Sequence, residues 1–167
     1  MEKHQIKRIK LLPDQINNSF RGKKISQYAF LIITVVTIVR SLIHVFAPDG
    51  GAQSIATIPL DTYSTEAAAT VILIFSFWGL SQLLMGLVYI GVYVKYKTLI
   101  PMMYVLLIIE YAMRIVIGQM KPIVTTGTAP GSVDSWVMVP VCVVLLALSL
   151  IQSKRDLSET PAYSGKQ

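Results

Sequence analysis

Two pairs of ionisable side chains lie inside long apolar runs of this sequence. Glu110 and Arg114 lie in IIEYAMRIVIGQM, and Arg40 and His44 lie in the run that ends in RSLIHVF. The members of each pair are four residues apart, which places them on one face of a helix. Such residues can bind a polar or anionic group, carry protons, or tie neighbouring helices together.

The elements around these pairs are strongly apolar. The chain has 167 residues, of which 53% are hydrophobic and 14% are charged, a composition typical of a membrane protein that crosses the bilayer several times. A helix needs about 20 apolar residues to cross a hydrocarbon layer about 30 Å thick. Runs of this kind occupy residues 27–46, 68–94, 99–120 and 133–151. We therefore predict an all-α membrane protein in which residues 27–152 form a bundle of four transmembrane helices.

Basic residues are concentrated on alternate flanks of these runs. Lys and Arg are frequent in segment 1–26 and in the tail 153–167, and two lie between the second and third runs, whereas loop 47–67 has none. Cytoplasmic flanks of membrane helices carry an excess of Lys and Arg. The pattern predicts a multi-pass membrane protein with both termini in the cytoplasm. It also accounts for the net charge of +6 without a nucleic-acid partner.

The amino-terminal segment allows two interpretations. Apolar residues recur there at helical spacing among basic ones: Ile6, Ile9, Leu12, Ile16 and Phe20. The segment can be an amphipathic helix on anionic lipid, which would make membrane lipids a direct partner. It can equally be an ordinary basic flank, because Pro13 interrupts the helical pattern.

The two charged pairs lie at similar depths. With a rise of about 1.5 Å per residue from the cytoplasmic ends of their helices, Arg40 and Glu110 lie roughly 20 Å and 18 Å into the bilayer. His44 and Arg114 lie roughly 26 Å and 24 Å in. A charge that faces lipid costs from about 3 to more than 10 kcal/mol. We therefore expect both faces to turn inward and form one polar cluster between the first and third helices.

The charges of this predicted cluster do not balance. Arg40 and Arg114 are positive, Glu110 is negative, and a buried His44 is expected to be neutral, so one negative charge is lacking. Four acidic residues near the outer ends of the helices could supply it: Asp49, Asp61, Glu66 and Asp134. If one of them does, the cluster is a closed structural network. If none does, the cluster should bind an anion or a polar lipid, quinone or polyprenyl head group.

Other functional chemistry is poorly represented. Cys142 is the only cysteine and His4 and His44 are the only histidines, which excludes disulfide frameworks, thiolate metal sites and haem held by two membrane histidines. HExxH, Walker and GxSxG motifs do not occur in the sequence. We predict a protein that is not an enzyme and that holds neither a metal ion nor a cofactor.

Small residues on the second run predict close helix packing. Gly79 and Gly86 are seven residues apart, which gives a seam where another helix can approach. Trp78 and Gln82 lie on the same helix.

Several motifs resemble those of small bacterial DoxX-like four-helix membrane proteins. They are RSLIHVF at the end of the first run, FWGLSQLLMGLVYIG in the second, and MRIVIGQMKP followed by a Gly/Pro loop and a last run that contains proline. The resemblance covers most of residues 28–151. It implies a four-helix fold in the bacterial cytoplasmic (inner) membrane and an accessory membrane subunit, in some relatives linked to respiratory or redox enzymes. It transfers no catalytic residue.

Two classes of function are therefore expected. The first is an accessory subunit of a larger membrane complex or homo-oligomer, or a protein that binds lipid or another hydrophobic ligand at the polar cluster. The alternative is a small transporter or channel with Glu110 in its pathway. Proton coupling at Glu110 is disfavoured, because the neighbouring Arg114 favours the ionised carboxylate.

Overall fold

The computed structural model describes residues 11–151, and all regular structure within them is helical. The helices are α1 (Lys24–Phe46), α2 (Thr65–Lys95), α3 (Ile100–Met120) and α4 (Pro130–Leu150), with short 3-10 turns at Leu60–Thr62 and Lys97–Leu99. Each long helix begins and ends within three residues of its predicted bounds. All four are long and apolar enough to cross a membrane, which confirms this part of the prediction. Residues 1–10 and the predicted tail 153–167 lie outside the described residues.

Local sequence explains where the helices begin and end. Pro48 follows shortly after α1, and the residue before a proline disfavours helical geometry. The hydroxyl of Ser64 accepts a hydrogen bond from the backbone N–H of Ala67 at 3.2 Å and so caps α2. Pro101 and Pro130 lie in the first turns of α3 and α4, where a missing N–H leaves no helical hydrogen bond unmade.

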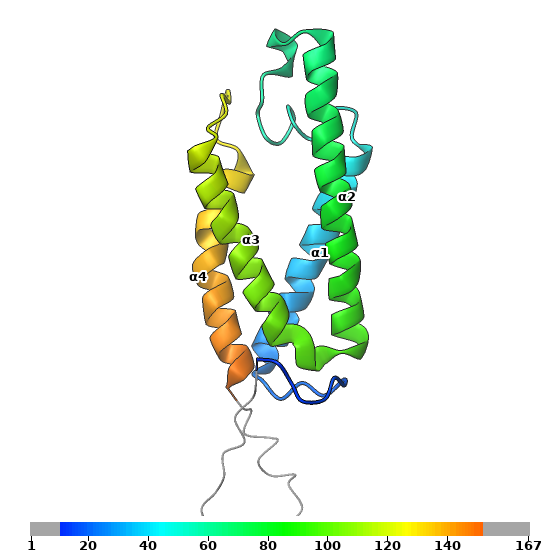
Figure 1. The fold of residues 1–167 in the computed structure, drawn as a ribbon, viewed down its shortest axis with the longest axis vertical. Coiled ribbons are helices and arrows are strands. Elements are labelled where there is room, and N and C mark those ends of the chain that lie inside the picture. Colours follow the sequence, from blue (N-terminus) through cyan, green and yellow to red (C-terminus); the bar gives the residue numbers. More distant parts are fainter. Residues whose placement is uncertain (1–10, 152–167) are drawn as a thin grey trace, which may run out of the picture.

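The four helices are arranged as two pairs. α1 packs along α2, and α3 packs along α4 (Figure 1). The pairs meet near the ends of α1 and α4 that lead to the chain termini, here the proximal end, and separate toward the opposite, distal end (Figure 1). The short loop between the second and third apolar runs predicts that these two helices form an antiparallel hairpin. The short turn at Lys97–Leu99 does join α2 to α3, but beyond it each helix packs mainly on another partner.

The proximal half contains the main core. The ring of Phe30 lies edge-on to those of Tyr89 and Tyr104, with centroids 5.4 Å and 5.8 Å away. The hydroxyl of Tyr104 donates a hydrogen bond of 2.5 Å to the carbonyl of Ser26. Cys142 of α4 is fully buried in the same core. All four helices therefore contribute to the region where the two pairs meet.

The glycine seam of α2 faces α1 within the same chain. A Cβ atom added at Gly79 would lie 2.6 Å from Cβ of His44, and one at Gly86 would lie 2.7 Å from Cγ1 of Ile38. Only glycine allows the two helices to approach so closely. The seam predicted from Gly79 and Gly86 thus serves packing inside the chain.

The distal loops are ordered by their own hydrogen bonds. The carboxylate of Asp49 accepts backbone N–H bonds from Gly51, Gln53 and Ser54, at 2.9, 3.1 and 2.6 Å. The loop before α2 is tied to the loop before α4 because the backbone N–H of Thr126 donates to the carbonyl of Thr57 at 2.9 Å. The two helix pairs are therefore joined at both ends and separate between them.

Candidate functional site

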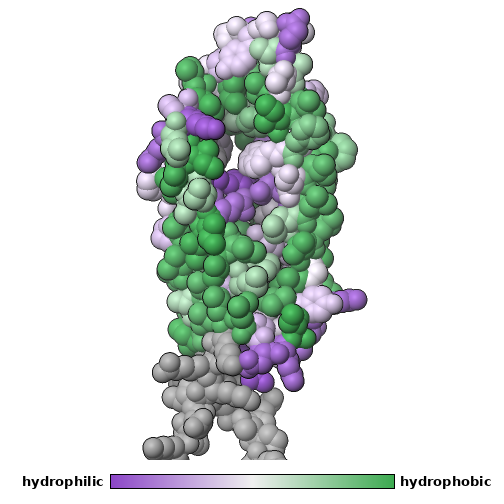
Figure 2. Space-filling model, in the orientation of Figure 1, coloured by the Kyte–Doolittle hydropathy of each residue, from purple (hydrophilic) through white to green (hydrophobic). Residues whose placement is uncertain are grey.

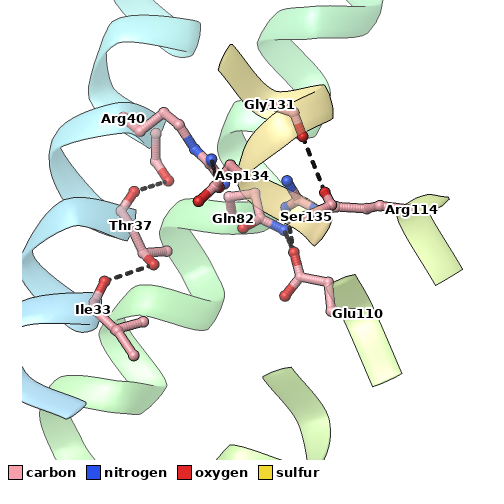
Figure 3. Close-up of polar contacts among 10 residues, drawn as sticks. Ile33, Thr37, Arg40, Gln82, Glu110, Arg114, Gly131, Asp134 and Ser135 are labelled. Carbon is pink, nitrogen blue, oxygen red and sulfur yellow. Dashed lines mark hydrogen bonds and ion pairs between the residues drawn. The ribbon is translucent and has the colours of Figure 1, made fainter. Parts of the chain in front are cut away.

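Glu110 and Arg114 form an ion pair one turn apart on α3. Nη2 of Arg114 contacts Oε1 of Glu110, and the same oxygen accepts a hydrogen bond of 2.8 Å from Nε2 of Gln82 on α2 (Figure 3). The carboxylate thus links two helices that make little other contact.

A second ion pair connects α1 to α4. Nη1 of Arg40 lies 3.4 Å from Oδ2 of Asp134 (Figure 3). Asp134 is therefore the acidic residue that balances the cluster: Arg40 and Arg114 supply two positive charges, and Glu110 and Asp134 supply two negative charges.

The other acidic candidates lie elsewhere. Asp49 accepts hydrogen bonds within its own loop, and Asp61 and Glu66 are exposed at the distal end of the molecule. Partial burial would raise the pKa of Asp49, but the N–H groups of Ser54, Gly51 and Gln53 together outweigh that effect and hold the pKa below its ordinary value. Its carboxylate therefore serves the loop and not the cluster.

Both arginines of the cluster lie near the indole ring of Trp78 on α2. The guanidinium carbons of Arg40 and Arg114 are 5.8 Å and 5.1 Å from the centroid of its ring, within the range of cation–π attraction. Arg114 also lies 5.4 Å from the ring of Tyr111. The sequence places Trp78 and Gln82 on one helix, but neither was included in the predicted polar cluster, and Gln82 was considered only as part of a transporter pathway with Glu110. The signal was present, because both lie about 20–26 Å along α2 from its end at Lys95, which matches the distances counted for the charged pairs along their own helices.

His44 was predicted to belong to the cluster, and the structure does not bring it into the ion pairs. Its side chain is 3% exposed, and Nδ1 lies 2.7 Å from the carbonyl oxygen of Gly50. A carbonyl only accepts, so Nδ1 carries the proton in this contact. The ring packs against Trp78 and Phe75, with centroids 4.7 Å and 5.9 Å away. His44 therefore holds the loop after α1 and packs against Trp78.

The charged side chains remain partly accessible. Their exposed fractions are 23% for Arg40, 36% for Asp134, 20% for Arg114 and 27% for Glu110. Figure 2 shows an opening between the two helix pairs in the distal half, with hydrophilic residues beside it and apolar residues along both pairs. Toward the proximal end, the buried core residues Tyr89 and Leu107 lie between the pairs. We call the opening in the distal half, beside the two ion pairs Arg40–Asp134 and Glu110–Arg114, the lateral opening.

The acidic, cysteine and histidine residues do not assemble a metal site in residues 11–151. Within this part of the chain, no three such side chains come together in a way that could hold a metal ion. Cys142 is buried and unpaired by any disulfide. The chemistry available at the lateral opening is therefore hydrogen bonding, ion pairing and stacking on an aromatic ring.

Comparisons of this chain with protein families, with curated proteins and with solved structures found no match. The resemblance to DoxX-like proteins therefore stays a prediction. Function has to be inferred from the geometry of the cluster and its surroundings.

Proposed function

We propose that this chain is an integral protein of the bacterial cytoplasmic membrane, with α1 to α4 crossing the bilayer and both chain ends in the cytoplasm. Helices of 21 to 31 residues are about 32–46 Å long, sufficient for a hydrocarbon layer of about 30 Å. The proximal end carries several cations of the described chain: Arg21, Lys23, Lys24, Lys95 and Lys97. The distal loops carry Lys121 and several acidic residues. This asymmetry supports a cytoplasmic proximal end.

We further propose that the lateral opening binds the polar head group of a lipid or another membrane amphiphile, whose apolar tail leaves between the two helix pairs. The observation that carries this proposal is the exposure of four charged side chains, 20% to 36%, in an otherwise apolar region. In hydrocarbon, charges exposed in this way are costly unless polar groups surround them. A head group in the opening supplies such groups, and its tail would lie beside the apolar helix surfaces.

The charges of the cluster indicate which head groups fit. Two cations and two anions balance, so the site does not require a ligand with a net negative charge. Each guanidinium has five N–H donors, and the ion pairs engage Nη1 of Arg40 and Nη2 of Arg114. The remaining donors suit oxygen acceptors such as carbonyls or the phosphate of a zwitterionic lipid. A neutral or zwitterionic amphiphile therefore fits best.

The transporter alternative has one supporting contact. Gln82 donates to Glu110, which extends the polar chain from α3 to α2. A pathway would have to continue toward the proximal end, where Tyr89, Leu107 and Met103 are buried in the apolar core. The accessory-subunit alternative rests on the DoxX-like resemblance, and the Gly79/Gly86 seam that could have docked a partner is covered by α1. Both alternatives have less support than amphiphile binding.

A charge-neutral double variant tests amphiphile binding. Glu110→Gln/Arg114→Gln removes one ion pair and keeps the side-chain volumes similar, and Lys121→Gln/Asp61→Asn makes the same change of charge at exposed distal positions. Purified in mild detergent and measured by native mass spectrometry, wild type and control should carry one dominant amphiphile. The folded cluster variant should lose most of that occupancy. Full occupancy in the cluster variant, or an empty wild type, would contradict the proposal.

Folding is measured separately by thermal melting of each variant. If Glu110→Gln/Arg114→Gln does not fold, Arg40→Lys provides the same readout, because it keeps a charge beside Asp134 and loses the planar guanidinium. Normal melting and normal occupancy in Arg40→Lys would also contradict the proposal.

A further inference from the structure

The segment 11–22 lies at the proximal end and takes no part in the lateral opening (Figure 1). It is fixed beneath the turn between α2 and α3 by contacts between Asn17 and Thr98. The backbone N–H and the hydroxyl of Thr98 donate to the carbonyl of Asn17 at 3.3 Å and 3.0 Å. The N–H of Asn17 donates to the Thr98 hydroxyl oxygen at 3.1 Å. The segment thus has a defined position although it is not helical in the described residues.

The end of the segment is held by the last residues of α4. The backbone N–H of Lys23 donates to the carbonyl of Leu148 at 3.1 Å, and Gly22 is buried against the backbone of Ser149. A side chain at Gly22 would collide with that backbone. The segment therefore spans the proximal end from the α2–α3 turn to the end of α4.

This fixed segment presents apolar side chains to the outside. Leu11, Leu12 and Ile16 are 40%, 63% and 58% exposed. Arg21 and Lys24 are close to the segment in the sequence, and both are exposed. Lys95 and Lys97 lie beside the α2–α3 turn, where Lys95 is exposed and Lys97 is half-buried. The acidic residue of the segment, Asp14, is already engaged in an interaction. We call these three apolar residues and four cations the proximal collar.

We propose that the proximal collar binds anionic lipid head groups, with Leu12 and Ile16 inserted among the upper parts of the acyl chains. Cations beside isolated exposed apolar side chains are typical of segments that lie in a membrane interface. The collar also lies at the ends of the apolar helix surfaces, where the interface must be if α1 to α4 cross the bilayer. The inference rests on the proposed membrane insertion, but it does not depend on binding at the lateral opening.

Lipid competition tests the charges of the collar. Full-length protein is equilibrated with vesicles of mixed phosphatidylglycerol and phosphatidylcholine, extracted, and its bound lipids are counted by native mass spectrometry. Each cation near a membrane surface strengthens anionic-lipid binding about fivefold, so Arg21→Gln/Lys95→Gln/Lys97→Gln should reduce the preference for phosphatidylglycerol by at least about tenfold. Lys121→Gln at the distal end should leave it unchanged. An unchanged preference in the triple variant would overturn the proposal.

A second experiment tests the position of the segment with matched variants of Thr98. Leu12→Cys carries a thiol-reactive nitrobenzoxadiazole fluorophore, which phosphatidylglycerol with a nitroxide on its acyl chain should quench, and the fully buried Cys142 is protected from labelling. Thr98→Val removes the hydroxyl contacts to Asn17 and should weaken quenching, whereas Thr98→Ser keeps them and should not. Equal quenching in the parent protein, in Thr98→Val and in Thr98→Ser would contradict the proposed role of the segment 11–22.

Two further outcomes separate the possible explanations. Copurification of an acidic protein by wild type but not by the triple variant, without any lipid preference, would replace lipid with a protein partner and overturn the proposal. Amphiphile occupancy at the lateral opening should be the same in the triple variant and in wild type. Failure at the collar is therefore distinguishable from failure at the opening.

Discussion

Arg40 of α1 and Arg114 of α3 lie over the same indole ring, that of Trp78, at 5.8 Å and 5.1 Å from its centroid. Attraction to one ring brings two like charges together, and each of them has its own carboxylate, Asp134 or Glu110. The arrangement joins side chains of all four helices in the distal half, where the two helix pairs separate (Figure 3). It explains how the pairs are kept in a fixed relation in this half of the bundle, where they lie apart.

Replacement of Trp78 should therefore destabilise the whole bundle. Trp78→Leu removes two cation–π contacts, each worth about 0.5–2 kcal/mol, and the packing against His44. We expect a clear decrease in melting temperature in detergent. The control is Trp136→Leu, because Trp136 is 60% exposed. Equal melting temperatures for the two variants would show that the indole does not organise the cluster.

The two ion pairs should differ in strength. Arg114 and Glu110 are in direct contact and Gln82 adds a hydrogen bond, whereas Arg40 and Asp134 are 3.4 Å apart and Asp134 is 36% exposed. Double-mutant cycles with Gln and Asn replacements should give a coupling energy of about 1–3 kcal/mol for the first pair and below about 1 kcal/mol for the second. The reverse order would contradict the geometry of the cluster.

Two glycines of α2 should respond oppositely to alanine. Gly91→Ala should raise stability by up to about 1 kcal/mol, because alanine favours helix and nothing lies within 4 Å of the added Cβ. Gly79→Ala should lower stability, because its Cβ would lie 2.6 Å from that of His44 and force α1 away. Chemical denaturation or thermal melting of both variants measures the difference. A stabilising Gly79→Ala would mean that α1 and α2 do not pack this closely.

Acid should weaken the loop after α1 through Asp49. Because hydrogen bonds lower the pKa of Asp49 in the folded protein, its contribution is complete above the ordinary pKa of 3.8 and is lost as the pH falls through the folded value. Wild type should lose stability between about pH 4 and pH 2 more steeply than Asp49→Asn, which lacks the titrating group. Melting curves across this range test the difference, and parallel pH profiles would exclude this role for Asp49.

Much of the fold could be predicted from the sequence, because the apolar runs and prolines determine where the helices form. The pairing of the helices could not. The short turn at Lys97–Leu99 indicated neighbouring helices, but Gly79 and Gly86 allow α1 to approach α2 more closely than α3 does. Which helix occupies a small-residue seam depends on tertiary packing that the seam itself does not specify.

The candidate site was predictable in its helical part. The helical rise places Arg40, Glu110 and Arg114 at similar depths. In the structure both arginines lie near the ring of Trp78, and Glu110 forms an ion pair with Arg114. Asp134 was one of four acidic candidates, and only the meeting of α4 with α1 distinguishes it. His44 packs against Trp78 but forms no ion pair, because the backbone after α1 folds back to offer the carbonyl of Gly50, a contact that helical spacing cannot foresee.

The tail of the proposed amphiphile leaves the lateral opening between the two helix pairs, beside Trp78. In Trp136→Phe, Trp78 is the only tryptophan left of the two in the chain, so its fluorescence reports on the lateral opening alone. In bilayers of lipids brominated along the acyl chain, we predict strong quenching of Trp78, and weaker quenching when a tightly bound amphiphile from the native membrane is retained. Fluorescence that is unchanged by brominated lipid in the delipidated protein would contradict the account.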